Sequence, residues 1–412
     1  MSITVTAPSS GFRGVLLKCL SPVAIIAIAQ LFGTSLWFSA NGAAESLMIA
    51  WQASAADIGW LTNAVQLGFI IGTLGLSLSG AADRFRASWL FFCCAIAGSL
   101  FNLAFAWLAD GLAIGAALRF CVGVTLAGIY PMGMKLIVGW APERTGLALA
   151  QLVAMLTLGT ALPHALRLVG ADWPWQFIIT ASSILALAGA ALIALLGDGP
   201  HARGPLPGNT ASARRAGAIL GAFGISRFRA ATFGYFGHMW ELYAFWTVVP
   251  LIVARSALAQ AYPALGVAGL SFCIIAVGAL GSLLGGILSQ RVGSARVALV
   301  SLGMSGLCGL AFVLVHEQLQ PWLLLVLLAL WGASVVADSP QFSALAAKAC
   351  PRDAVGSALA IQNSIGFAIT VVSIACTTWL FERVGIDALW ILVPGPILGL
   401  LGYIGSVKQQ EA

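Results

Sequence analysis

Apolar runs of roughly 18 residues or more recur along this chain, and each can cross the ~30 Å hydrocarbon core of a bilayer as a helix. Membrane-spanning strands would instead show segments of about ten residues with alternating polarity. The 412-residue chain is 60% hydrophobic and only 8% charged, which excludes a soluble multidomain protein. The sequence therefore predicts an all-α membrane protein that crosses the bilayer many times.

Twelve transmembrane helices account for the apolar runs. Most connections between them are short, but 199–229 is long, contains five arginines and separates two sets of six helices. We therefore predict an N-terminal six-helix bundle over 1–198, a cytoplasmic central linker over 199–229 and a C-terminal six-helix bundle over 230–412. The predicted spans are about 20–41, 58–79, 88–108, 112–138, 146–168, 174–197, 230–254, 264–289, 297–316, 321–347, 355–380 and 386–407.

The positions of lysine and arginine predict the orientation of these helices. With the N-terminus inside the cell, sixteen of the 20 basic residues lie on the cytoplasmic side, three lie outside and Arg119 lies within the membrane. Both termini are therefore expected in the cytoplasm and the chain in the inner membrane. Positive-inside loops explain the net charge of +6, so no nucleic-acid partner is implied. The first apolar run exceeds a typical signal core, so we expect it to stay as helix one.

One apolar segment, Phe233–Trp246, carries His238 and Glu241 one helical turn apart. An acid at mid-bilayer depth costs roughly 2.5–3.5 kcal/mol on insertion scales, so such residues usually mark a solute or proton path. On a helix, Gly234 and Phe245 share a stripe with them, and we expect this stripe to face a cavity. Two structural alternatives stay open: Glu241 could pair with a cation on another helix, and His238 could hydrogen-bond a carbonyl.

The two halves of the chain carry an internal repeat. The stretch 79–86 aligns with 286–293 at an offset of 207, and Pro131 pairs with Pro340 at an offset of 209. Parallel repeats of this kind characterise one large class of secondary transporters, in which the solute site lies between the halves near the midplane.

Four stretches carry recognisable motifs. They are Asp83, Arg84, Phe85 and Arg86 in the loop after helix two, Gly286, Leu288, Arg291 and Gly293 in its repeat, Arg119 and Gly123 in helix four, and 173–177 before helix six. These motifs resemble those of the major facilitator superfamily, and the resemblance covers essentially the whole chain. The family implies two bundles that rock about a cavity lined by helices one, four, seven and ten, in a protein that is a monomer by default.

The cavity helices supply the candidate site residues. Helix ten carries Asp338 beside Pro340, which interrupts the hydrogen-bond ladder at this depth. Arg119 could anchor an anionic solute or pair with Glu241 or Asp338, and both interpretations stay open. We predict proton coupling by Glu241, His238 and Asp338, and solute binding by Arg119, Trp37, Asn41, Trp240, Tyr243, Trp331, Gln341 and Gln30.

The loop after helix two carries a different expectation, which follows from the resemblance. In the family this loop acts as a conformational latch, with its acid facing the N-terminal end of helix eleven, where the macrodipole favours negative charge. We carry the latch over to Asp83, Arg84, Arg86 and Arg291.

These features predict a secondary active transporter that moves a small organic solute, an anion being one option, by proton-coupled alternating access. Its partners would be the solute, protons and the lipid bilayer. Proton-antiport efflux and a non-transporting receptor or scaffold remain alternatives. Nitrate or nitrite carriage is disfavoured, because the carriers of these anions in the family have arginines within helices two and eight. Neither predicted helix has one here. The sequence contains no H-E-x-x-H, G-x-S-x-G or P-loop motif and no metal-ligand spacing, so we predict no enzyme activity, cofactor or metal.

Overall fold

The computed structural model describes residues 19–142, 145–202, 221–350 and 355–408, and within these ranges the chain is helical and has no strand. This confirms the predicted all-α fold. Nine stretches of helix in the described residues are long and apolar enough to cross a membrane, and the last of them, Ala358–Lys408, contains two successive helices. The first helix, which is broken, and α12, which carries charged side chains, bring the total to the twelve predicted.

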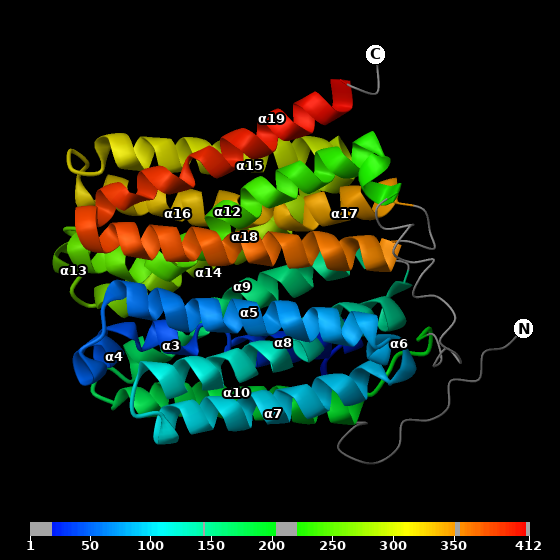
Figure 1. Cartoon of the computed structure of the whole chain (residues 1–412), viewed down its shortest axis with the longest axis horizontal. Coiled ribbons are helices and arrows are strands. Elements are labelled where there is room, and N and C mark those ends of the chain that lie inside the picture. The colour runs from blue at the N-terminus through cyan, green and yellow to red at the C-terminus, as the bar shows by residue number, and fades with distance from the viewer. Residues whose placement is uncertain (1–18, 143–144, 203–220, 351–354, 409–412) are drawn as a thin grey trace, which may run out of the picture.

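The long helices run side by side along the longest axis of the molecule (Figure 1). The helices of the first half lie in the lower part of that view. They are α2 (Pro22–Thr34), α3 (Ser39–Gly42), α4 (Ala44–Trp51), α5 (Ala55–Leu78), α6 (Ala81–Arg84), α7 (Ala87–Leu108), α8 (Leu112–Trp140), α9 (Thr145–Val169) and α10 (Trp175–Leu196).

The helices of the second half lie mainly in the upper part of Figure 1. They are α12 (Ser226–Arg255), α13 (Leu258–Ala261), α14 (Gly266–Val292), α15 (Ser294–Val315), α16 (Pro321–Ala337), α17 (Ser339–Ala349), α18 (Val355–Val384), the 3-10 helix η2 (Gly385–Leu392) and α19 (Pro394–Lys408).

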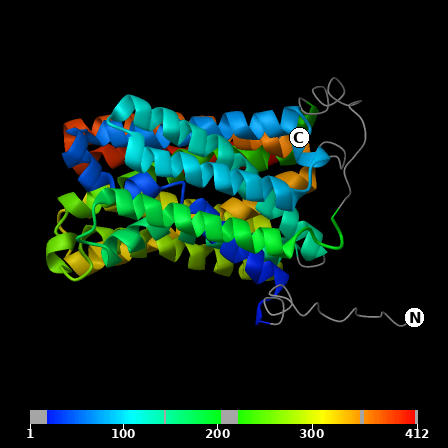
Figure 2. The ribbon, with the colours of Figure 1, turned by 90° about the horizontal axis from the view of Figure 1, so that it is seen from below.

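Short helices mark the two ends of the bundle. One end carries α6 and is called the α6 end; the opposite end carries α4 and α13 and is called the α4 end (Figure 1). The view from below shows the same parallel helices with their connections gathered at these two ends (Figure 2). Much of the predicted linker 199–229 lies outside the described residues, and α12 begins at Ser226, a few residues before the predicted 230.

The two groups of helices meet along two seams, α5 against α18 and α9 against α14. On the first seam, the Asn63 side-chain amide donates to the Val371 carbonyl at 3.1 Å. On the second, the Ser282 hydroxyl donates to the Ala150 carbonyl at 3.3 Å. Because each seam joins one helix from each half, relative motion of the halves has to slide or hinge along them.

Two of the predicted spans divide into separate α-helical segments, and a third, over 386–407, begins as the 3-10 helix η2 before α19 starts. The predicted helix over about 20–41 ends at Thr34 and resumes at Ser39, so the single span expected there is wrong in detail. The span over 321–347 breaks at Asp338, two residues before Pro340, as the proline predicted. Both breaks leave backbone groups without their helical partners inside the membrane, where side chains have to replace them.

Glycines allow α5 and α8 to pack backbone against backbone. A Cβ added at Gly68 would lie 2.0 Å from the Phe120 carbonyl oxygen, and one at Gly123 would lie 2.1 Å from that of Val65. Membrane helices associate closely where small residues line their interface, because dispersion contacts replace the missing hydrophobic drive. This contact therefore depends on the absence of side chains at Gly68 and Gly123.

We expect Gly68→Ala to destabilise the protein by about 1–3 kcal/mol, because the added methyl group meets backbone that has no room to move. Thermal unfolding in detergent measures the effect. Gly75→Ala on the same helix is the control, since nothing lies within 4 Å of its added Cβ. Equal unfolding temperatures for the two variants would contradict the close packing of α5 on α8.

Candidate functional site

A cavity of about 270 Å³ lies between the two groups of helices. Its described lining comes from α5, α8, α9, α12, α16, α17 and α18, and contains no Asp, Glu, Lys or Arg. Helix one contributes no lining residue, whereas the family resemblance implied that it would. The polar and aromatic lining residues are Thr73, Tyr130, Thr157, Tyr235, His238, Tyr243, Trp246, Ser339, Ser343, Asn363 and Phe367.

Some polar atoms of this lining have no hydrogen-bond partner in the described part of the protein. They are the Thr73 hydroxyl, the His238 Nε2 and the Trp246 N–H, all fully shielded from bulk solvent. Buried polar groups in native proteins are nearly always satisfied. A cavity that holds three such atoms is therefore suited to a polar occupant.

His238 and Asp338 meet at the edge of this cavity. The His238 Nδ1 lies 2.8 Å from the Asp338 Oδ1, and both side chains are buried. The contact is close, but its geometry is not that of an aligned hydrogen bond. Asp338 stands at the break between α16 and α17, and its carbonyl accepts from the Gln341 and Phe342 amides. The pair thus couples α12 to the broken helix.

Glu241 does not line the cavity and forms no salt bridge with His238 or with a basic residue of the described chain. Its carboxylate accepts a hydrogen bond from the Ser305 hydroxyl at 2.7 Å and another from the Trp331 N–H at 2.6 Å. The side chain is 1% exposed and lies among α12, α15 and α16. Glu241 therefore ties three helices of the second half together.

The stripe predicted on α12 faces α15, α16 and α17 instead of the cavity. Gly234 packs against Phe342, and the Phe245 ring packs against Trp331 with 4.5 Å between centroids. The cavity side of α12 is the neighbouring stripe, which includes Tyr235, Leu242 and Trp246. His238 lies between the two stripes, so it alone of the predicted stripe reaches the lining.

Arg119 is fully buried inside the first half. Its guanidinium donates to the Leu36 carbonyl at 3.0 Å, to the Asn102 side-chain oxygen at 2.9 Å and to the Trp37 carbonyl. The Leu36 and Trp37 carbonyls belong to the gap between α2 and α3. Arg119 thereby replaces the helical hydrogen bonds lost at that break. The pairing with Glu241 or Asp338 considered from the sequence is not formed.

Aromatic rings from both halves close the cavity toward the α4 end. Trp37 packs against Tyr243 and Phe367, with 5.7 and 5.8 Å between ring centroids. Phe38 meets the edge of Trp246 at 5.9 Å. These contacts join the gap in helix one to α12 and α18, while Thr73, Met134 and Ser343 extend the lining toward the α6 end.

The sequence matches the model of the Major Facilitator Superfamily over residues 23–373. The chain belongs to this superfamily. It is therefore a multi-pass membrane protein. Its matches are to transporters, and none of them indicates a catalytic family. A comparison with curated proteins found no match.

Solved structures of this superfamily share the fold of the chain. A crystal structure of a point mutant of the nucleoside transporter NupG matches with a TM-score of 0.70 and 12% identity, covering 94% of this chain and 99% of that one. The xylose transporter XylE from E. coli, in a partially occluded inward open conformation, matches at 0.70 and 14%, with 94% and 96% covered. A D-xylose-proton symporter matches at 0.71 and 15%, with the same coverage.

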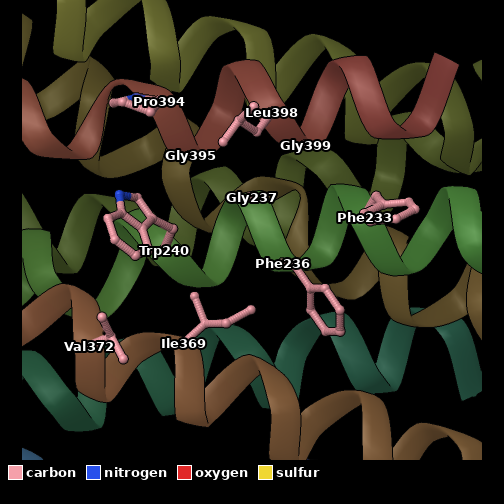
Figure 3. A pocket seen from close by; sticks show the side chains of 10 residues that line it. All are labelled: Phe233, Phe236, Gly237, Trp240, Ile369, Val372, Pro394, Gly395, Leu398 and Gly399. Atoms are coloured by element: carbon pink, nitrogen blue, oxygen red, sulfur yellow. The ribbon is translucent and has the colours of Figure 1, made fainter. Parts of the chain in front are cut away.

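The other predicted solute-binding residues lie away from the cavity lining. The Trp331 N–H donates to the Glu241 carboxylate, as described above. Gln30 and Gln341 are buried on α2 and α17, and Asn41 donates to the Thr62 hydroxyl at 3.0 Å. Trp240 donates to the Ile391 carbonyl at 2.7 Å and lines an apolar pocket among α12, α18 and α19 (Figure 3). Of the eight predicted, only Tyr243 belongs to the lining.

The internal repeat of the sequence could have identified lining residues that were missed when site residues were selected by their charge or polarity. Tyr130 and Ser339 precede the paired prolines Pro131 and Pro340, so they are related by the same offset of 209. Both line the cavity. A search for polar residues at equivalent positions of the two halves would have selected them without any charge as a signal.

The predicted latch is only partly within the described residues. The side chain of Asp83 and the residues 351–354 before helix eleven lie outside them, while Arg84 and Arg291 are exposed. Arg86 bonds Asp198 at 2.8 Å, and Ser88 donates to the same carboxylate. Burial opposes ionisation of Asp198, but the hydrogen bonds from Arg86 and Ser88 outweigh it and lower its pKa.

A carboxylate caps a helix of the opposite half at the α4 end. Glu382 on α18 accepts a hydrogen bond from the Ala56 amide, in the first turn of α5, at 2.7 Å. Negative charge is favoured at a helix N-terminus because the first amides lack partners. This contact and the ring contacts of Trp37 and Phe38 described above hold the two halves together at the α4 end.

Arg119→Lys separates a structural arginine from a solute anchor. Lysine cannot reach the Leu36 and Trp37 carbonyls and Asn102 together, so we expect a loss of about 1–3 kcal/mol. Thermal unfolding in detergent measures this loss, and uptake assays in liposomes give the KM. Unchanged stability with a strongly raised KM would instead support the anion-anchor interpretation.

Proposed function

We propose that this protein is a secondary active transporter that carries a small organic solute across the inner membrane by proton-coupled alternating access. The observation that supports this most directly is the cavity between the two halves, with the buried His238–Asp338 pair at its edge. Transporters of this architecture hold their solute between the repeats near the midplane. The segments 1–198 and 230–412 act as the two rocking bundles, and 199–229 connects them.

The solute is an uncharged polar molecule with a ring face. The described lining offers hydroxyl groups, an amide, the His238 imidazole and aromatic rings but no Asp, Glu, Lys or Arg. Such a surface hydrogen-bonds and stacks, whereas an anion would need a cation to offset its loss of hydration. The two terminal amino groups of Arg119 bond helix one and Asn102, and Arg119 does not belong to the cavity lining. Similar structures are named for a nucleoside and for xylose, which are both polar ring compounds.

Proton coupling resides in His238 and Asp338, with Glu241 as a buried neighbour. A proton on Asp338 removes its charge and its attraction to His238. The two helical segments that meet at Asp338 are then free to change their angle, because the pair no longer holds this point to α12. Binding of a proton thus shifts the balance between conformations by its different free energy in each.

The α6 end faces the cytoplasm in this proposal, as the basic residues predict. The cavity extends toward that end, and the aromatic cluster and the Glu382 contact close the other side. The conformation is therefore inward-facing or occluded. Outward opening requires Trp37 to separate from Tyr243 and Phe367.

Proton movement in proteoliposomes that contain a pH dye tests the coupling. We expect solute-triggered proton flux in the wild type and its loss in Asp338→Asn, because the neutral amide cannot exchange a proton. Uncharged, anionic and cationic solutes are screened together, and the sign of the flux distinguishes symport from antiport efflux. Solute flux without proton movement in the wild type would contradict coupling, and no flux of any solute would favour a receptor or scaffold.

Glu241→Gln is the matched carboxylate control. Its amide oxygen can still accept from the Trp331 N–H, so we expect reduced stability but retained proton flux. Lost coupling in a stably folded Glu241→Gln, with coupling retained in Asp338→Asn, would assign the proton to Glu241 instead.

Tyr235→Phe tests the cavity as the solute site. Removing one hydroxyl group that bonds the solute costs about 0.5–1.5 kcal/mol, so we expect KM to rise about 2–12-fold with proton coupling intact. Tyr262→Phe, outside the cavity lining, is the matched control and should leave KM unchanged. Equal KM values for both variants and the wild type would exclude Tyr235 from solute binding.

A further inference from the structure

A small cavity of about 40 Å³ lies between the two halves at the α4 end, beside α3 and α4 (Figure 1). Helix one and α9 form its walls in the first half, and α12 and α14 form them in the second. The lining residues are 41–46, His164, Arg167, Pro250, Val267 and Ala268. None of them lines the solute cavity. We call this small cavity the outer pocket.

His164 contributes a polar atom to the outer pocket that the protein does not satisfy. The side chain is 2% exposed, and its Nε2 has no hydrogen-bond partner in the described part of the chain. By contrast, Asn41 donates to the Thr62 hydroxyl at 3.0 Å, and Arg167 donates to the Ser46 hydroxyl at 3.0 Å. The outer pocket exceeds the ~10–15 Å³ that one water molecule needs, so water can reach this nitrogen.

Close packing holds His164 at the boundary between the halves. A Cβ added at Gly42 would lie 2.5 Å from the Pro163 Cβ, so helix one packs directly on the residue before His164. One turn further along α9, a Cβ added at Gly269 of α14 would lie 3.1 Å from the Leu168 side chain. The outer pocket is therefore closed only while α14 lies against α9.

The outer pocket lies next to the closed end of the solute cavity. Trp246 lines the solute cavity and Pro250 lines the outer pocket, and these two residues are about one helical turn apart on α12. Pro250 has no N–H to give the Trp246 carbonyl, so this turn of α12 lacks one helical hydrogen bond. Separation of the halves at the α4 end has to open the outer pocket as well as the solute cavity.

The charges around His164 favour its neutral form while the pocket is closed. Arg167 stands three residues further along α9, on the same face, and Glu45 on α4 is exposed to solvent. The described lining from α3, α12 and α14 has no titratable group. A protonated imidazole in the closed pocket is removed from water and placed near a like charge. The solvated Glu45 offsets little of this cost.

We propose that His164 is an outer proton site that controls opening at the α4 end, an inference that rests on the alternating access proposed above. When the halves separate there, a proton from the outer water adds to the lone pair of Nε2. The halves close again only after this proton has returned to the same water. Acid on the outside therefore favours the outward-open conformation, and this proton is separate from the one exchanged by His238 and Asp338.

Access of a membrane-impermeant maleimide to Ala43→Cys measures this opening. Ala43 lines the outer pocket and is 2% exposed, so the reagent reaches this position only when the pocket opens. The labelling rate is divided by that of Gln318→Cys, an exposed position at the same end, which removes the direct effect of pH on the thiol. Protein without an added cysteine gives the background. A histidine in water titrates near pH 6.5, so we expect the ratio to rise about tenfold as the external pH falls from about 8 to about 5.5.

Histidine variants of the Ala43→Cys protein identify the group that responds. His164→Gln should abolish the rise, because glutamine binds no proton in this range, and His164→Asn repeats the test with a smaller side chain. His316→Gln is the matched control and should retain the rise, since His316 stacks on Phe312 at the same end, outside the outer pocket.

The proposal is overturned if the labelling ratio does not change with external pH, if its rise persists in both His164 variants, or if His316→Gln abolishes it too. Unfolding temperatures equal to that of the parent exclude misfolding of the variants. The assay contains no solute, so a lack of solute-driven proton flux and a lack of a pH response are separate results.

Discussion

Backbone N–H and C=O groups inside a bilayer find no water, so every interruption of a membrane helix needs a partner from the protein itself. This chain interrupts two helices, one in each of its halves. At the first break, Arg119 from α8 donates to the Leu36 and Trp37 carbonyls. At the second, Asp338 begins a new helical segment and contacts His238 on α12. Arg119 thus supplies the missing partners at the first break, and Asp338 stands at the second, against His238.

The buried ionisable side chain that ties several helices together is a base in the first half and an acid in the second. In the first half a cation, Arg119, bonds helix one and Asn102 on α7. In the second half an anion, Glu241, bonds Ser305 on α15 and Trp331 on α16. Each side chain holds three helices of its own bundle together. The cavity between them is left nearly free of fixed charge and is suited to an uncharged polar solute.

His238 differs from these residues because it lies on the boundary between bundle and cavity. It contacts Asp338 at the helix break and also belongs to the cavity lining. A group at this position lies against both the cavity and the break between α16 and α17.

The sequence by itself determined the helical membrane fold, the repeat and the helices that carry Arg119, His238, Glu241 and Asp338, because hydropathy and proline act through local chemistry. The tertiary structure decided which face of each helix packs against which neighbour. A residue step rotates a helix by about 100°, so Glu241 and Tyr235 point to different neighbours although both lie near His238. No proline marks the break between Thr34 and Ser39 in the sequence. Arg119 stabilises this break from another helix, which only the tertiary structure reveals.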